Sequence, residues 1–140
     1  MSGIENTLCV IKPNAVARNK IGAIVEHFED EGLRIAALRM TRPSVAQVKS
    51  FYAEHEGKPF FERLVDFMTS GPVCAMVLEG PRAIERTREI MGATNPEEAK
   101  PGTIRALYGD NMTENAVHGS DSPESAAREI GFYFAGFDIF

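Results

Sequence analysis

The sequence predicts an α/β sandwich in which helices cover an antiparallel sheet. Apolar runs of strand length alternate with segments of helical periodicity, in the order β-α-β-α-α-β-α-loop-β-α. The two βαβ-like halves of this order are typical of a ferredoxin-like βαββαβ core. At 140 residues and 44% hydrophobic content, the chain fits a single domain, residues 1–140, that can bury a core without disulfide or metal support.

The first strand is predicted at residues 7–12, TLCVIK, an apolar run that ends at Pro13. A helix follows, because apolar residues recur at the i, i+3, i+4 and i+7 spacing of one helix face before Gly32 ends it: Ile21, Ile24, Val25 and Phe28. Residues 33–40, LRIAALRM, alternate only in part and are expected to form the second strand.

Two helices are predicted next. Ser44 and Gln47 have capping-box spacing and open a helix with four apolar residues, Val45, Val48, Phe51 and Tyr52. The sequence GKP at residues 57–59 separates it from a helix that stops at Gly71 and Pro72 and contains Phe60, Leu64, Phe67 and Met68. Residues 73–78, VCAMVL, are expected to form the third strand.

Proline and glycine mark the remaining elements. Pro81 suits the first position of a helix that Gly92 ends. Residues 93–103, ATNPEEAKPGT, form a loop whose length indicates more than a simple connection. A short strand at residues 116–118 and a helix from Ser122 and Pro123 to about Ile130, ended by Gly131, complete the chain.

Composition excludes several classes of protein. The net charge of −5 at pH 7 argues against a general nucleic-acid-binding protein, since contacts to phosphates need a basic face. No apolar run approaches the ~18 residues of a membrane span, and the N-terminus lacks the pattern of a signal peptide. Cys9 and Cys74 stand singly in apolar segments, which favours buried thiols in a reducing compartment over a disulfide or a metal site. We therefore expect a cytoplasmic protein.

The segment NAVHGSD, residues 115–121, places His118 among small and hydroxyl-bearing residues just before the last helix. An unperturbed imidazole has a pKa near ~6.5 and is mostly neutral at pH 7, so its lone pair can attack an electrophile such as phosphorus. From spacing alone, a nucleophile and an ordinary polar histidine are equally consistent with this position.

The neighbours of His118 favour the nucleophile. Gly119 has no side chain that would block a substrate, and Ser120 can hold a carboxylate or a ring nitrogen. The helix that follows would point its positive end toward this turn and favour an anion there. Glu129, two turns along that helix, can anchor Ser120 or orient the imidazole, although a helix glutamate is most often only solvated.

Residues around the long loop are suited to an anionic substrate. Lys12 ends an otherwise apolar strand. Arg88, Thr94 and Arg105 lie before, within and just after the loop, and guanidinium groups match phosphate oxygens. Taken singly, each arginine is better explained as a surface charge, but together with His118 they fit a polyphosphate site.

The sequence contains few other features that would bind a ligand or a metal. Neither G-x-x-x-x-G-K-[ST] nor G-x-G-x-x-G occurs in the sequence, which excludes a P-loop or a dinucleotide fold as the phosphate site. The histidines are far apart and lack metal-ligand spacing, and we interpret His27 and His55 as surface or structural residues. Phe60 follows a proline and can stack on a flat ring, although its pattern alone favours core packing.

These segments together resemble the nucleoside diphosphate kinase family. NAVHGSD is similar to the family's active-site signature, and TLCVIKPNAV to its first strand. FYAEHEGKPFF is similar to its nucleotide-binding helical hairpin, and MGATNPEEAKPGTIR to its long loop. The similarity covers essentially the whole chain. It implies a ping-pong transfer of the γ-phosphate from a nucleoside triphosphate such as ATP to a nucleoside diphosphate, with Mg²⁺ as cofactor.

The resemblance also implies a role for each site residue. His118 would carry the phosphate on its pros nitrogen as a phosphohistidine, while Ser120 and Glu129 orient the ring. Lys12 and Asn115 would hold the ribose hydroxyls, and Lys12 the phosphates as well. The remaining residues would bind the rest of the nucleotide: Tyr52, Arg88, Thr94 and Arg105 the phosphates, and Phe60, Leu64 and Met112 the base. Mg²⁺ would bridge the phosphates without ligands from the protein.

Three positions differ from many relatives: Asn14 replaces Asp, Phe51 replaces His, and Met112 replaces Val or Ile. We expect changed loop packing or base affinity, with activity kept. The chain ends at FDIF, without the longer tail of many hexameric relatives, so we expect dimers built through the sheets and favour a tetramer over a hexamer. The alternative function is a non-catalytic nucleotide-binding regulatory module of the same fold, which would have no need for the nucleophile.

Overall fold

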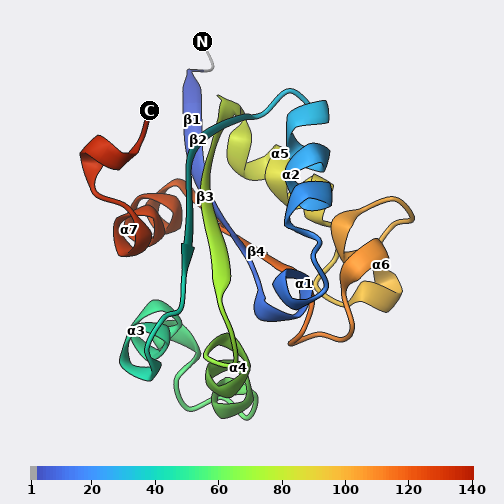
Figure 1. Cartoon of the computed structure of the whole chain (residues 1–140), viewed down its shortest axis with the longest axis vertical. Helices are drawn as coiled ribbons and strands as arrows, with labels where there is room; N and C mark the ends of the chain where they lie inside the picture. Colours follow the sequence, from blue (N-terminus) through green and yellow to red (C-terminus); the bar gives the residue numbers. More distant parts are fainter. Residues whose placement is uncertain (1–2) are drawn as a thin grey trace.

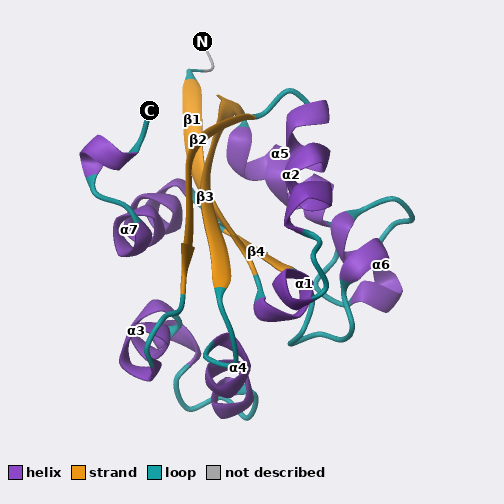
Figure 2. Ribbon diagram, viewed as in Figure 1, coloured by secondary structure: helices purple, strands orange, loops and turns teal. Residues whose placement is uncertain are grey.

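The computed structural model describes residues 3–140 and contains a four-stranded sheet with helices on both faces (Figures 1 and 2). Its strands are β1 (Ile4–Ile11), β2 (Arg34–Thr41), β3 (Val73–Pro81) and β4 (Val117–Gly119). They lie in the order β2-β3-β1-β4, and each neighbouring pair is antiparallel. The ferredoxin-like antiparallel sheet predicted from the sequence is therefore confirmed.

Helices lie in the connections between the strands and after the last strand. They are α1 (Pro13–Ala17), α2 (Ile21–Asp30), α3 (Val45–Phe51), α4 (Phe61–Met68), α5 (Ala83–Met91), α6 (Ile104–Tyr108) and α7 (Pro123–Tyr133). The predicted capping box is present, since Ser44 Oγ accepts from the Gln47 N–H at 3.1 Å and the Gln47 side chain accepts from the Ser44 N–H at 2.8 Å. Within residues 3–140, no helix is long and apolar enough to cross a membrane.

Some element ends differ from expectation. Pro81 is the last residue of β3, opposite Ile4, and α5 begins only at Ala83. A proline is tolerated there because the strand ends with it. Helix α7 continues through Gly131 to Tyr133, since the burial of Tyr133 outweighs the cost of about 1 kcal/mol that a glycine adds inside a helix. Helices α1 and α6 were not expected, because five residues are too few to show a helical period.

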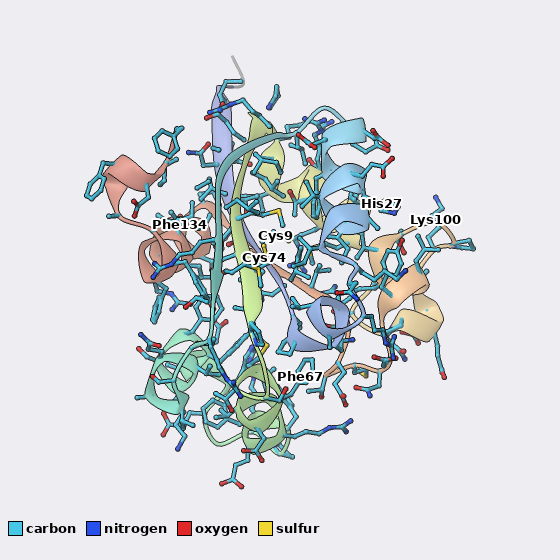
Figure 3. The ribbon with its side chains drawn as sticks, viewed as in Figure 1. Cys9, His27, Phe67, Cys74, Lys100 and Phe134 are labelled. Carbon is cyan, nitrogen blue, oxygen red and sulfur yellow. The ribbon has the colours of Figure 1, made fainter. Side chains whose placement is uncertain are left out.

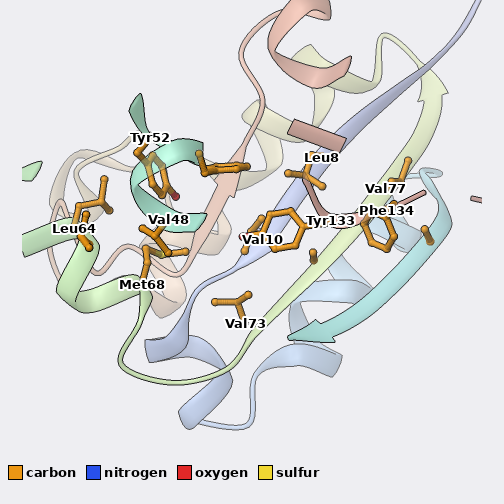
Figure 4. Close-up of a cluster of buried hydrophobic side chains, with 14 of the residues drawn as sticks. Leu8, Val10, Val48, Tyr52, Leu64, Met68, Val73, Val77, Tyr133 and Phe134 are labelled. Carbon is orange, nitrogen blue, oxygen red and sulfur yellow. The ribbon is translucent and has the colours of Figure 1, made fainter. Parts of the chain in front are cut away.

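Two cores lie on opposite faces of the sheet, because successive residues of a strand point to opposite sides. Leu8 and Val10 of β1 pack toward α3, α4 and α7 in the cluster shown in Figure 4. Cys9 and Ile11 pack with residues of α2, α5 and α6 on the other face. The two cysteines are free and buried near the middle of the molecule (Figure 3), which confirms the predicted core thiols, and burial raises the pKa of the Cys9 thiol.

Gly92 ends α5 with φ of 88° and ψ of −179°, a conformation almost confined to glycine. A Cβ at this position would lie 2.5 Å from Oγ1 and 2.7 Å from Cβ of Thr103. We expect Gly92→Ala to lower the free energy of unfolding by about 2–4 kcal/mol through strain and steric overlap. Urea denaturation measures this change.

Gly131→Ala provides the matched control for that substitution. Gly131 is exposed inside α7, and nothing lies within 4 Å of an added Cβ. We expect alanine there to raise the free energy of unfolding by about 0.5–1 kcal/mol, because it costs less backbone entropy in a helix. A Gly92→Ala variant as stable as Gly131→Ala would contradict the strain argument.

Candidate active site

Strand β4 sets the direction of the His118 side chain. His118 lies opposite Val10 of β1 and faces the rings of α3, whereas Val117 belongs to the core on the α5 face. Gly119 also points to α5, since a Cβ there would lie 2.6 Å from Met91 Sδ. Gly119 also lines the cavity that contains His118, as expected from its lack of a side chain, and its close packing on α5 is a second reason for glycine at this position.

A carboxylate holds the imidazole, and a hydroxyl holds that carboxylate. His118 Nε2 lies 2.7 Å from Glu129 Oε1, and Ser120 Oγ donates to the same oxygen at 2.9 Å. Glu129 is 4% exposed on α7, and Ser122 caps this helix by accepting from the Ser125 N–H. Because a carboxylate only accepts, Nε2 carries the proton and the lone pair of Nδ1 is free.

The protonation states of this pair favour a nucleophile. Burial lowers the pKa of His118 below 6.5, and Lys12 and Arg105 lower it further, against the opposing hydrogen bond and charge of Glu129. Burial alone would raise the pKa of Glu129, but the hydrogen bond with His118 and the charges around it keep that pKa below its ordinary value. At pH 7 a neutral imidazole therefore faces an ionised carboxylate.

The lowered pKa of His118 predicts the pH range in which the imidazole is neutral. Protonation of His118 removes the lone pair of Nδ1. Because the pKa of His118 is lowered, this protonation takes place only at more acidic pH. We expect a ¹⁵N NMR titration of the ligand-free protein to give a midpoint for His118 below 6.5. Glu129→Gln should lower the midpoint further, because the charge that raises it is removed. A midpoint above 6.5 in the unsubstituted protein would contradict the desolvated site.

Lys12 and Asn115 join the start of α1 to the loop before β4. Lys12 Nζ donates to Asn115 Oδ1 at 2.8 Å. The Asn115 amide donates to the backbone oxygens of Thr94 and Met112, each at 3.0 Å, and so ties the long loop to the same place. Burial, and then the charge of Arg105, lower the pKa of Lys12 to about 7. An anion beside this amine would stabilise its charged form.

Two arginines reach the same place from α5 and α6. Arg105 is only 7% exposed, and it donates to the backbone oxygens of Gly92 at 3.0 Å and Val117 at 2.9 Å. Its Nε finds no partner among residues 3–140. Arg88 is exposed and donates to the Gly119 oxygen at 3.3 Å. Arg105 is therefore not a surface charge. Its burial could not be predicted from the sequence, because α6 was not expected.

The other end of the site is apolar and partly open. Phe60 is 44% and Met112 60% exposed, so core packing is the wrong alternative for Phe60. Leu64 is buried beneath this end and belongs to the core of Figure 4. Tyr52 is also buried, and its hydroxyl finds no hydrogen-bond partner among residues 3–140. Two exposed apolar side chains beside a cavity can hold a flat ring between them.

His55 is one of the cavity residues that sequence reasoning missed, together with Glu54, Thr113 and Asp121. Its ring stacks on Tyr52 at a centroid distance of 6.1 Å and an interplanar angle of 27°. It also lies 5.4 Å from the ring of Phe60. Its position between these two residues in FYAEHEGKPFF was the available signal. His27 packs on Tyr108 and lines no cavity described for residues 3–140, in keeping with a structural role.

These side chains surround a cavity of about 480 Å³, within the usual size of a small-molecule site. All predicted site residues except Ser120 line it: Lys12, Tyr52, Phe60, Leu64, Arg88, Thr94, Arg105, Met112, Asn115, His118 and Glu129. Ser120 is buried behind it and acts on the cavity through Glu129. Residues far apart in the sequence thus meet at the end of the sheet where β4 lies.

A larger hollow of about 1080 Å³ adjoins the cavity and shares Arg88, Thr94, Arg105 and Asp121 with it. Its lining mixes basic side chains with the carboxylates of Glu5, Glu85, Glu89 and Glu98. These carboxylates make it less suited to a polyanion. Within residues 3–140, no group of three or more His, Cys, Asp or Glu side chains is arranged to hold a metal ion.

Asn14 differs from many relatives and has a local partner. Its amide donates to Asp110 Oδ2 and to the backbone oxygen of Glu114, each at 2.9 Å. Asp110 also forms an ion pair with Arg18 at 2.5 Å. An aspartate at position 14 would instead bring two carboxylates together, so asparagine fits the loop that Asp110 belongs to.

Comparisons with known proteins show which family the chain is similar to. The family model described as nucleoside diphosphate kinase matches residues 5–139. A nucleoside diphosphate kinase of Bdellovibrio bacteriovorus is 57% identical over 136 residues, which cover 97% of this chain and 96% of that protein.

Solved structures give the same result. A crystal structure of the Aquifex aeolicus nucleoside diphosphate kinase is similar with a TM-score of 0.96 and 48% identity, over 99% of this chain and 100% of that one. A halophilic nucleoside diphosphate kinase from Halobacterium salinarum, solved in complex with CDP, has a TM-score of 0.95 and 42% identity, over 99% and 92% of the two chains. The chain therefore belongs to the nucleoside diphosphate kinase family.

Proposed function

We propose that His118 is the nucleophile with which this nucleoside diphosphate kinase transfers the γ-phosphate of a nucleoside triphosphate to a nucleoside diphosphate. The observation that carries the proposal is the orientation of the imidazole. Nε2 is bound by Glu129, Nδ1 is free, and the ring lines a cavity that also contains Arg88 and Arg105. Neither arginine forms an ion pair with a carboxylate among residues 3–140.

The proposed reaction has two steps. In the first, the lone pair of Nδ1 attacks the γ-phosphorus, and the bond from that phosphorus to the β,γ-bridging oxygen breaks, so that the diphosphate leaves with the electron pair. The proton stays on Nε2, where Glu129 accepts its hydrogen bond and stabilises the positive charge that develops on the ring. In the second step, a terminal oxygen of the acceptor diphosphate attacks phosphorus and the N–P bond breaks.

Phosphoryl transfer depends mainly on alignment and charge neutralisation. Arg105 is suited to this because two backbone oxygens hold its guanidinium group in place. Lys12, Arg88, Tyr52 and Thr94 would complete the phosphate site. We propose Mg²⁺ as cofactor, where it would neutralise phosphate charge. The carboxylates of Glu54 and Asp121 line the cavity without forming a metal cluster, so the phosphates would supply the ligands.

The base would lie between Phe60 and Met112, with Leu64 beneath, and Lys12 and Asn115 would hold the ribose hydroxyls. Stacking uses the flat face that every base has, whereas hydrogen bonds to base edges would select one base. The exposure of both Phe60 and Met112 supports a broad range of accepted nucleotides.

Labelling tests the proposed chemistry directly. The protein is incubated with γ-labelled ATP and Mg²⁺ without an acceptor. We expect label on the protein that is labile in acid, stable in alkali and discharged by GDP. A non-catalytic nucleotide-binding module would bind ATP without retaining label. Label that is stable in acid would point to an ester on a hydroxyl and would overturn the proposed nucleophile.

We also propose a single domain over residues 1–140, a cytoplasmic location and a dimer-based homo-oligomer, with a tetramer favoured over a hexamer. The buried free thiols of Cys9 and Cys74 support a reducing compartment.

Strand β2 supports the proposed oligomer. It lies at an edge of the sheet, and Leu38 and Met40 on it are 55% and 51% exposed. An apolar edge strand favours pairing with a second copy. Sedimentation equilibrium of Leu38→Lys tests this interface.

A further inference from the structure

Phe51 packs against His118 from the end of α3. It is 4% exposed, and its ring centroid lies 5.2 Å from that of the imidazole at an interplanar angle of 71°. The same ring contacts three other aromatic rings at centroid distances of 4.9, 5.3 and 5.7 Å: those of Tyr52, Phe132 and Tyr133. Steep ring contacts of this kind have a preferred geometry, so Phe51 is itself held firmly.

Among residues 3–140, the ring of His118 therefore has one polar contact and two aromatic neighbours. The hydrogen bond to Glu129 fixes Nε2, and the ring of Tyr52 lies 5.7 Å away at 88°. A half-turn of the imidazole about its Cβ–Cγ bond would put Cε1 where Nε2 lies and Cδ2 where Nδ1 lies, so the hydrogen bond to Glu129 would be lost and Nδ1 would leave its position in the cavity. Without that hydrogen bond, the proton can occupy either nitrogen. Aromatic rings on two successive residues leave little space for that turn.

We propose that Phe51 is a positioning residue that keeps Nε2 of His118 on Glu129 and Nδ1 directed toward the cavity. The proposal rests on the proposed function of His118 as nucleophile. A ring suits this place because its flat face fills the space beside the imidazole, while Glu129 already supplies the hydrogen bond to Nε2. The charged groups that act on His118 are Glu129, Lys12 and Arg105, and a substitution at position 51 leaves all of them in place.

The test compares Phe51→Leu with Val48→Ala. Val48 is 3% exposed, lies one turn earlier on α3 and belongs to the same core, but forms no aromatic contact with His118. ¹⁵N NMR of the ligand-free proteins reports which nitrogen of His118 carries the proton, and rapid-quench kinetics reports phosphorylation by MgATP. We expect Phe51→Leu to give a mixture of tautomers and to slow phosphorylation by about tenfold, with KM changed by less than about twofold.

The conservative variant Phe51→Tyr keeps the ring and should restore the single tautomer. Unchanged tautomer and rate in Phe51→Leu would overturn the proposal, as would an equal effect of Val48→Ala. Should Phe51→Leu fail to fold, Phe132→Leu decides. Phe132 is 39% exposed and packs on Phe51 at 5.3 Å, so its replacement loosens Phe51 without leaving a buried void. We expect Phe132→Leu to change the tautomer population of His118 and the phosphorylation rate in the same direction as Phe51→Leu, but by less. An unchanged tautomer population and rate would refute the proposal.

The two proposals can fail separately. His118→Ala that still accepts label would remove the proposed nucleophile and leave the NMR result on Phe51 standing. Conversely, acid-labile label on His118 together with an unaltered tautomer in the Phe51→Leu and Phe132→Leu variants would leave the proposed function intact and remove Phe51 from it.

Discussion

His118→Ala is expected to abolish phosphoryl transfer, with a loss of about four orders of magnitude or more in both phosphorylation by MgATP and turnover. The reason is that no other lone pair among residues 3–140 occupies the position of Nδ1. Glu129 lies at Nε2, where it also accepts from Ser120, and the Lys12 amine is held at the loop before β4 by its donation to Asn115. Rapid-quench labelling and a coupled assay measure the two rates.

The fold should survive this substitution. The His118 side chain is 19% exposed, and its removal leaves Glu129 with the hydrogen bond from Ser120. His27→Ala is the control, since His27 packs on Tyr108 away from the cavity. That variant should retain full label. Transfer by His118→Ala at the unsubstituted rate, or loss of label in His27→Ala, would show that the nucleophile was misassigned.

Arg105→Ala is expected to slow phosphorylation by about 10²–10³-fold, because a fixed positive charge is lost from the proposed phosphate site. The same substitution removes the donors to the Gly92 and Val117 oxygens, which should lower the free energy of unfolding by about 1–3 kcal/mol. The rate of labelling and a urea titration separate the two effects.

Arg86→Ala is the matched control for Arg105→Ala. Arg86, on α5, also donates to two backbone oxygens, those of Pro81 and Glu31. It lines neither the cavity that contains His118 nor the adjoining hollow. We expect it to lose some stability while labelling stays at the unsubstituted rate. Equal slowing in both variants would mean that Arg105 acts only through the fold.

Local sequence signals were enough to predict most of the fold and the pairing of His118 with Glu129. The apolar runs of β1 and β3, the capping box at Ser44 and the Ser122 cap are local features, and the structure contains all of them. The contact between His118 and Glu129 could also be predicted, because a short strand followed directly by a helix brings the two side chains together. The roles of the site residues remain proposals.

The rest depends on contacts that no local pattern contains. The burial of Arg105 follows from α6, a helix too short to show a period. The place of His55 between Tyr52 and Phe60 depends on how the turn after α3 folds back. The need for glycine at position 119 comes from Met91, which lies on a different element. Each of these is set by packing between elements, which the sequence order of the elements does not specify.

The buried Tyr52 hydroxyl, without a partner among residues 3–140, has a consequence for protein engineering. A buried hydroxyl with no acceptor or donor weakens a fold, so Tyr52→Phe should be neutral or favourable for heat resistance. Selection for thermal tolerance alone would therefore tend to replace polar residues of the cavity that contains His118. A library screened for heat tolerance needs a simultaneous activity screen to retain such costly groups.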